Sequence, residues 1–70
     1  MGFVLQIASS SDRDAVVAEI WWNDLMVAEM RRGADGHSYI DLYPSPSRTP
    51  WSFRFEEWVA VTKEAEGLLG

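Results

Sequence analysis

The sequence predicts an α+β domain in which four antiparallel strands form a meander and one C-terminal helix packs on one face of the sheet. Two observations predict this fold. Apolar residues alternate with polar ones over much of the first part of the chain, whereas after residue 54 they recur with helical spacing. Between these parts, residues 44–50 contain three prolines, which suit neither a central strand nor a helix. We therefore expect one domain, residues 1–70, with the element order ββββα.

The strand part of the chain is divided by three groups of turn-forming residues. Residues 9–14 are polar, Asn23 and Asp24 tolerate the left-handed backbone of a tight hairpin, and residues 33–36 contain two glycines. The segments between them are rich in β-branched and aromatic residues or alternate in polarity. Strands are therefore expected at residues 2–8, 15–22, 25–32 and 37–43.

The helix is expected at residues 54–69. Glu56 and Glu57 lie in its first turn, where carboxylates interact favourably with the helix dipole. Its apolar stripe consists of Trp58, Val61, Ala65, Leu68 and Leu69. This stripe is expected to cover one face of the sheet.

The second hairpin has a register that separates charged from apolar side chains. In this register Trp22 pairs with Met26, which leaves Trp21, Val27, Glu29 and Arg31 on the opposite face. A shift of one residue would exchange Trp21 with Trp22 and remains an alternative. The preferred register predicts a sheet core of Phe3, Leu5, Ile7, Ala18, Ile20, Trp22, Met26, Ala28, Met30, Ile40 and Leu42 beneath Phe55, Trp58, Val61, Ala65 and Leu68.

Several classes of function are disfavoured by composition. The chain has no cysteine, which excludes a disulfide scaffold, a cysteine-ligated zinc ion and a thiol nucleophile. Small secreted domains usually depend on disulfides, so a cytoplasmic location is expected. The first residues lack the features of a signal peptide, and no stretch approaches the roughly 20 apolar residues of a membrane span.

The residues that could carry chemistry form no known constellation. His37 is the only histidine, so the roughly three nitrogen or sulfur ligands of a zinc site are missing. A calcium loop that begins at Asp12 would need glycine where Val17 stands. Glu56 and Glu57 are adjacent on the expected helix and point in different directions, which makes them a poor acid–base pair. We expect no cofactor, no metal and no catalytic residue, and an enzyme is the least favoured class.

The net charge is −5, from eleven acidic and six basic residues spread along the chain. No segment is basic enough to follow a phosphate backbone, so direct binding to nucleic acid is disfavoured. A protein partner with a basic surface is the natural counterpart of this charge. The alternative is that acidity serves only solubility.

The sheet face opposite the helix is the candidate contact surface. Aromatic residues alternate there with acids, and tyrosine and tryptophan are enriched in protein interfaces. Binding of another protein, self-association into a homodimer, and covering by loops are the three interpretations. The expected partner-binding residues are Glu19, Trp21, Glu29, Tyr39, Asp41 and Tyr43.

In size, acidity, lack of cysteine and lack of an active site, the chain resembles the small acidic inhibitors of phages and bacteria, such as anti-CRISPR, restriction-inhibiting and toxin-immunity proteins. The resemblance covers the whole chain and assigns a role to no residue. It implies a non-enzymatic protein that occludes a basic, nucleic-acid-binding surface of a partner. A structural or adaptor subunit of a homo- or hetero-oligomer is the alternative.

Overall fold

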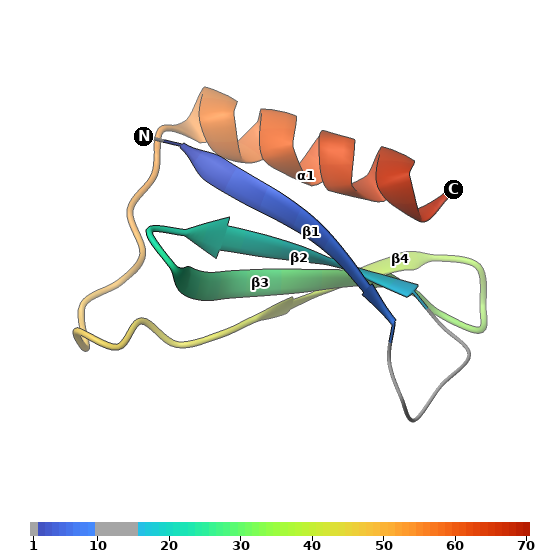
Figure 1. Ribbon diagram of the computed structural model, residues 1–70, viewed down its shortest axis with the longest axis horizontal. Helices are drawn as coiled ribbons and strands as arrows, with labels where there is room; N and C mark the ends of the chain where they lie inside the picture. The colour runs from blue at the N-terminus through green and yellow to red at the C-terminus, as the bar shows by residue number, and fades with distance from the viewer. Residues whose placement is uncertain (1, 10–15) are drawn as a thin grey trace.

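A computed structural model describes residues 2–9 and 16–70 of the chain. Four antiparallel strands form one sheet in the order β1-β2-β3-β4, and α1 packs on one face of it (Figure 1). The ββββα prediction is confirmed, and the bounds of these elements agree with the expected ones within one residue. The expected start of the second strand at residue 15, the turn over residues 10–14 and the calcium candidate at Asp12 lie outside the described residues. The elements are β1 (Phe3–Ser9), β2 (Val16–Trp22), β3 (Leu25–Arg32), β4 (Ser38–Leu42) and α1 (Phe55–Leu69).

The core lies between α1 and the sheet. Apolar side chains of β2 and β3 form its floor, and two residues of α1, one turn apart, close it from above. Aromatic and aliphatic residues from β1, from the segment before α1 and from α1 itself surround this centre. The buried residues are Ala18, Ile20, Val27, Ala28, Met30, Val61 and Ala65, with Phe3, Leu5, Trp22, Trp51, Phe53, Trp58 and Leu69 packed around them.

The β2–β3 hairpin turns tightly at Asn23 and Asp24. Their φ angles of 50° and 64° both lie in the left-handed region, which is typical of a two-residue hairpin turn that follows the twist of the strands. Because the loop has only two residues, Trp22 pairs with Leu25. The expected pairing of Trp22 with Met26 is therefore wrong.

A β-bulge restores the expected register farther along the hairpin. Trp21 lies opposite Met26, but the next pair joins Ile20 to Ala28, so Val27 is the extra residue. The bulge turns Val27 toward α1, where its exposed fraction is 1%. Val27 thus belongs to the core and not to the opposite face, whereas Met26 lies on the opposite face and not in the core.

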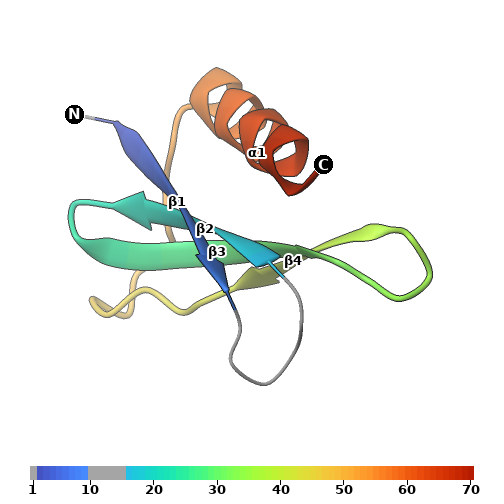
Figure 2. The same cartoon turned by 45° about the vertical axis from the view of Figure 1, so that its right-hand side comes forward.

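The helix covers β1, β2 and β3 and leaves the same side of β4 open. A helix is about 10 Å wide, whereas four strands about 4.8 Å apart span about 14 Å, so one helix cannot cover the whole sheet. Ile40 and Leu42 were expected in the core, but their exposed fractions are 38% and 65%. Ile7 was also expected in the core but is exposed. Figure 1 and Figure 2 show the reason, because the C-terminal end of β1, where Ile7 lies, diverges from α1.

Two helix residues expected in the core are also exposed, and the segment before the helix replaces them. Phe55 and Leu68 lie at the margins of the α1 stripe, which is centred on Val61 and Ala65. Trp51 and Phe53 instead form an aromatic ladder with Trp58, whose ring is stacked on Phe53 at a centroid distance of 5.9 Å. The sequence pattern gave no role to Trp51 and Phe53, because they follow the prolines and precede the helical periodicity.

The C-terminal end of α1 is attached to the start of β4. Ser38 Oγ donates a 2.8 Å hydrogen bond to Glu66 Oε2, and Arg32 Nη1 donates a 2.7 Å bond to Ser38 Oγ. Arg32 Nη2 also reaches the carbonyl oxygen of Gly70 at 3.1 Å. Over the part of the chain that the structure describes, no helix has the length and apolar character needed to cross a bilayer.

Candidate protein-binding face

The sheet face that points away from α1, called the outer face below, carries side chains in three rows that run across the strands. The register of the strand pairs defines these rows. The middle row contains three of the acidic residues of the chain, and the rows on either side are mainly apolar or aromatic. The rows are Val4, Trp21 and Met26; then Gln6, Glu19, Glu29 and Asp41; then Ala8, Val17, Arg31 and Tyr39.

Glu19, Glu29 and Asp41 form the acidic row. They occupy paired positions on β2, β3 and β4, so neighbouring carboxylates originate from strands about 5 Å apart. Like charges directly opposite each other on paired strands are destabilising, and Glu19 and Glu29 are in this position. A face that served stability alone would gain from a basic or neutral residue at one of them.

Each carboxylate of the acidic row accepts a hydrogen bond from a neighbouring side chain. Trp21 Nε1 donates to Glu19 Oε1 at 3.1 Å, and Arg31 Nε donates to Asp41 Oδ2 at 3.1 Å. The Glu29 carboxylate accepts from a tyrosine hydroxyl, that of Tyr43, at 3.1 Å. These bonds orient the carboxylates, and within the described part of the chain only one of the three charges is balanced by an ion pair.

The pKa of Tyr43 responds to the negative potential of this face. The hydrogen bond to Glu29 raises the pKa of Tyr43 above its ordinary value of 10.0, and partial burial and the charges of Glu29, Asp41 and Glu19 raise it further. All three carboxylates of the acidic row therefore act on one phenol. A cationic group that docked at the same place would be stabilised by the same three charges.

Tyr39 lies in the third row of the outer face, beside Arg31, where its contacts hold its ring in place. Its ring lies 4.9 Å from the guanidinium carbon of Arg31, which is a cation–π contact, and its hydroxyl group donates to the Asp35 carboxylate. This bond raises the pKa of Tyr39 and lowers the pKa of Asp35. Gly33 backs the ring so closely that a Cβ atom there would collide with it. The ring is thus fixed while 41% of the residue stays exposed.

The structure brings all six residues that the sequence predicted for this site to the outer face: Glu19, Trp21, Glu29, Tyr39, Asp41 and Tyr43. The same reasoning placed Val27 beside them, but the bulge turns Val27 into the core, so it is not part of the outer face. Met26 takes part in the face and was missed for the same reason. Arg31 was expected on this side of the hairpin, but its contacts with Asp41 and Tyr39 depend on the β3–β4 register, which the sequence pattern did not define.

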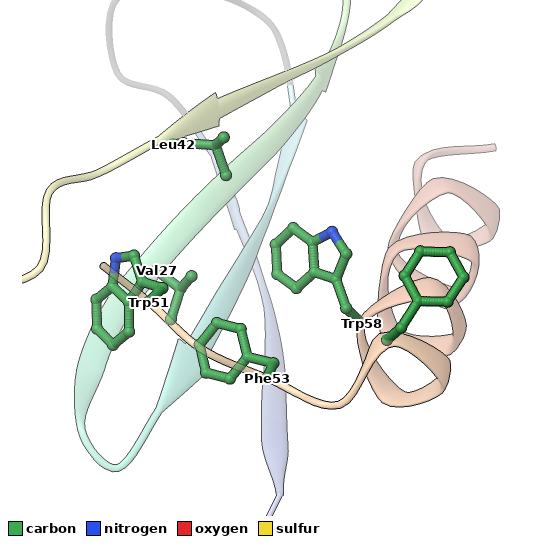
Figure 3. Close-up of a pocket in the computed structure, with 6 residues that line it drawn as sticks. Val27, Leu42, Trp51, Phe53 and Trp58 are labelled. Carbon is green, nitrogen blue, oxygen red and sulfur yellow. The ribbon is translucent and has the colours of Figure 1, made fainter. Parts of the chain in front are cut away.

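A second surface feature, called the groove below, lies on the opposite side of the sheet beside α1. It encloses about 330 Å³. Figure 3 shows the Trp58 indole reaching from α1 toward Leu42 of β4, with Trp51 and Phe53 on the segment that leads into the helix. All of its lining side chains are uncharged, so the groove can offer apolar and aromatic contacts. They are Val27, Leu42, Trp51, Phe53, Phe55 and Trp58.

Among residues 2–9 and 16–70, no group of three histidine, cysteine, aspartate or glutamate residues is arranged to hold a metal ion. No family model, curated protein or solved structure matches the chain.

Proposed function

We propose that the chain is a non-enzymatic protein-binding module that docks its outer face on a basic surface of a partner protein. The observation that carries the proposal is the acidic row, in which Glu19, Glu29 and Asp41 lie side by side and, among residues 2–9 and 16–70, only Asp41 is paired with a cation. Aromatic residues flank the row on both sides. Rigid aromatic side chains lose little conformational entropy on docking, and the carboxylates orient the approach.

The partner surface is one that ordinarily binds nucleic acid, and the chain acts as an inhibitor by occluding it. A row of fixed carboxylates on a sheet presents regularly spaced negative charge, as a phosphate backbone does. The net charge of −5 also attracts a basic partner over longer distances. Such binding fits a protein that works in the cytoplasm, where basic nucleic-acid-binding proteins are abundant.

The test is a capture experiment with the immobilised chain and a lysate of the source cells, analysed by mass spectrometry. The variant Glu19→Gln/Glu29→Gln/Asp41→Asn removes the acidic row. The matched control Glu56→Gln/Glu57→Gln/Glu64→Gln removes the same number of charges from exposed helix positions. We expect both the parent and the control to capture the same basic proteins, and the acidic-row variant to lose them.

Two further conditions separate occlusion from other binding. Added duplex DNA should displace the captured protein, because both ligands use one surface. Raising the salt from about 0.1 M to about 1 M shortens the Debye length from about 10 Å to about 3 Å and should weaken capture strongly. The proposal would be excluded if the acidic-row variant and the helix control captured the same proteins equally well, and if neither duplex DNA nor high salt reduced this capture.

A subunit of a larger assembly is the second candidate function. The specific observation in its favour is the exposed apolar surface beside the groove, where Leu42 and Phe55 are more than half exposed. This surface lies on the side of the sheet opposite the acidic row, so the two functions are compatible in one molecule.

A further inference from the structure

The strand β4 lies at an edge of the sheet, and one side of its backbone is open. Its neighbour on one side is β3, and among residues 2–9 and 16–70 no strand lies on its other side. Four of its five residues, those from Tyr39 to Leu42, are exposed. The backbone N–H and C=O groups along such an edge can pair with another strand.

Two residues of β4 direct their backbone groups toward the open edge. The backbone N–H of Tyr43 donates a 2.9 Å hydrogen bond to the carbonyl oxygen of Val27, so Tyr43 directs its backbone groups toward β3. Successive residues of a strand direct these groups to opposite sides, so Asp41 also faces β3, whereas Ile40 and Leu42 face away from it. Within the described part of the chain, no backbone hydrogen bond from another segment reaches Ile40 or Leu42.

The side chains of the same two residues form an apolar strip on the α1 side of the edge. Ile40 is 38% exposed and Leu42 is 65% exposed. Leu42 also lines the groove, together with Trp58 of α1. A strand added beside β4 would place one side chain opposite each of them, on the same side of the sheet. Apolar side chains at these positions would cover the strip, and the one opposite Leu42 would lie at the mouth of the groove.

The outer face sets a different requirement at the position between them. The acidic row runs from Glu19 through Glu29 to Asp41, so it ends at this edge. Arg31 is bonded to Oδ2 of Asp41, yet 47% of the Asp41 side chain is exposed. A residue of an added strand opposite Asp41 would extend the acidic row, and opposite charges on paired strands are stabilising. A basic residue fits this position.

The open backbone and the two faces together specify the occupant of the edge. Free N–H and C=O groups in strand geometry select an extended main chain, and the faces select alternating apolar and basic side chains. A second copy of the chain fits poorly, because it would bring another acidic row and another −5 to the same place. We propose that the chain binds an extended segment of a partner as a fifth antiparallel strand along β4, with apolar residues opposite Ile40 and Leu42 and a basic residue opposite Asp41.

Hydrogen exchange followed by NMR tests the proposal, with a short peptide of alternating lysine and valine as the probe at up to about 1 mM. The amides of Ile40 and Leu42 should exchange rapidly in the free chain. They should exchange slowly with the peptide bound, because their N–H groups are then hydrogen-bonded to it. The amide of Asp41, which faces β3 in both states, should change little.

Modified peptides separate strand pairing from attraction of charge. In the antiparallel arrangement the valines face Ile40 and Leu42 and direct their N–H groups toward β4. N-methylation of the valines should therefore weaken binding at least about tenfold. N-methylation of the lysines alters N–H groups on the far side of the peptide and should leave binding intact. A peptide with all lysines before all valines keeps the charge but loses the alternation, so it should not protect Ile40 and Leu42.

Variants of the chain locate the contact and keep it distinct from the proposed function. Leu42→Pro removes one outward N–H group and should abolish the protection of Ile40, whereas Leu42→Ser keeps that group and should bind more tightly than Leu42→Pro. Circular dichroism checks that both keep the fold, since proline is tolerated on edge strands where the N–H faces solvent. Glu19→Gln/Glu29→Gln disables most of the acidic row but keeps Asp41, and it should still bind the peptide along β4. Leu42→Pro should capture the same basic proteins as the parent chain, because the outer face is unchanged.

Three results would overturn the proposal of a fifth strand. The first is a parent chain in which the alternating peptide does not slow the exchange of Ile40 and Leu42. The second is a peptide with N-methylated valines, or with its lysines and valines in separate blocks, that protects these amides as well as the unmodified peptide does. The third is protection that arises on β1 and not on β4, which would move strand addition to the opposite edge.

Discussion

The hydroxyl group of Tyr43 donates a hydrogen bond of 3.1 Å to Oε1 of Glu29 on the outer face of the sheet. This bond is the main reason why the pKa of Tyr43 lies above 10.0, and the charges of Asp41 and Glu19 act in the same direction. The pKa of Tyr39 is raised as well, by its hydrogen bond to Asp35. Each phenol therefore ionises at a higher pH in the folded protein than in the unfolded chain.

Ultraviolet titration of the phenols follows directly from this arrangement. In Tyr39→Phe, Tyr43 is the only tyrosine, and we expect its phenolate to form above pH 10. Adding Glu29→Gln should lower this midpoint, because it removes the acceptor and its charge. Since the folded pKa is raised, the stabilisation is complete below pH 10 and is lost as the pH rises through the folded value. A midpoint at or below 10 in the single variant would contradict the Tyr43–Glu29 bond.

The two adjacent tryptophans should respond differently to truncation. Trp22 packs against Phe3 and Phe53 with ring centroids 4.9 Å and 5.1 Å away, so Trp22→Ala should cost about 3 kcal/mol. Trp21→Ala removes a part-buried residue with one side-chain hydrogen bond, to Glu19, and should cost about 1 kcal/mol. Thermal melting distinguishes the two, because 1 kcal/mol shifts the midpoint of a domain of this size by about 4–8 °C. Equal shifts would mean that the two side chains do not lie on opposite faces.

The order and bounds of the elements could be predicted because the period of apolar residues changes from two to 3.6 across the prolines. Part of the acidic row could also be predicted, since separating charge from apolar residues selected the right pairing of Ile20 with Ala28 and so placed Glu19 opposite Glu29. The position of Asp41 opposite Glu29 depends on the β3–β4 register, which the sequence pattern did not define. The bulge could not be predicted from the sequence. Turn chemistry at Asn23 and Asp24 favours one register and the alternation favours another, and only an extra residue satisfies both.

Coverage of the sheet was the other limit of sequence reasoning. Alternation assigns Ile40 and Leu42 to the α1 side of the sheet, which is correct, but it does not say how far one helix reaches. Trp51 and Phe53 lie outside both periodic patterns, so no local rule placed them on the core. The groove results from both facts together and had no signature in the sequence.

The β2–β3 turn offers a test through substitution of Asp24. Its φ of 64° is strained for a residue with a side chain, and glycine adopts this conformation freely. Asp24→Gly should therefore raise the free energy of unfolding by about 0.5 kcal/mol, measured by urea denaturation. Asp24→Asn removes the same charge and tolerates the same backbone, so it should be nearly neutral. Asp24→Ala should destabilise the fold, and an Ala variant as stable as the Gly variant would argue against the left-handed turn.

The bulge itself can be tested by replacing valine with threonine at two positions that simple alternation of the strands places on the same face. Val27 is buried by the bulge, whereas Val4 on the outer face is 60% exposed. Threonine has nearly the shape of valine but adds a hydroxyl group, which costs about 1–3 kcal/mol when it is buried without a partner. Val27→Thr should therefore lose stability in urea denaturation, while Val4→Thr should stay within about 0.5 kcal/mol of the parent, as exposed substitutions usually do. If both variants unfold at the parent's urea concentration, Val27 faces water and the hairpin has no bulge.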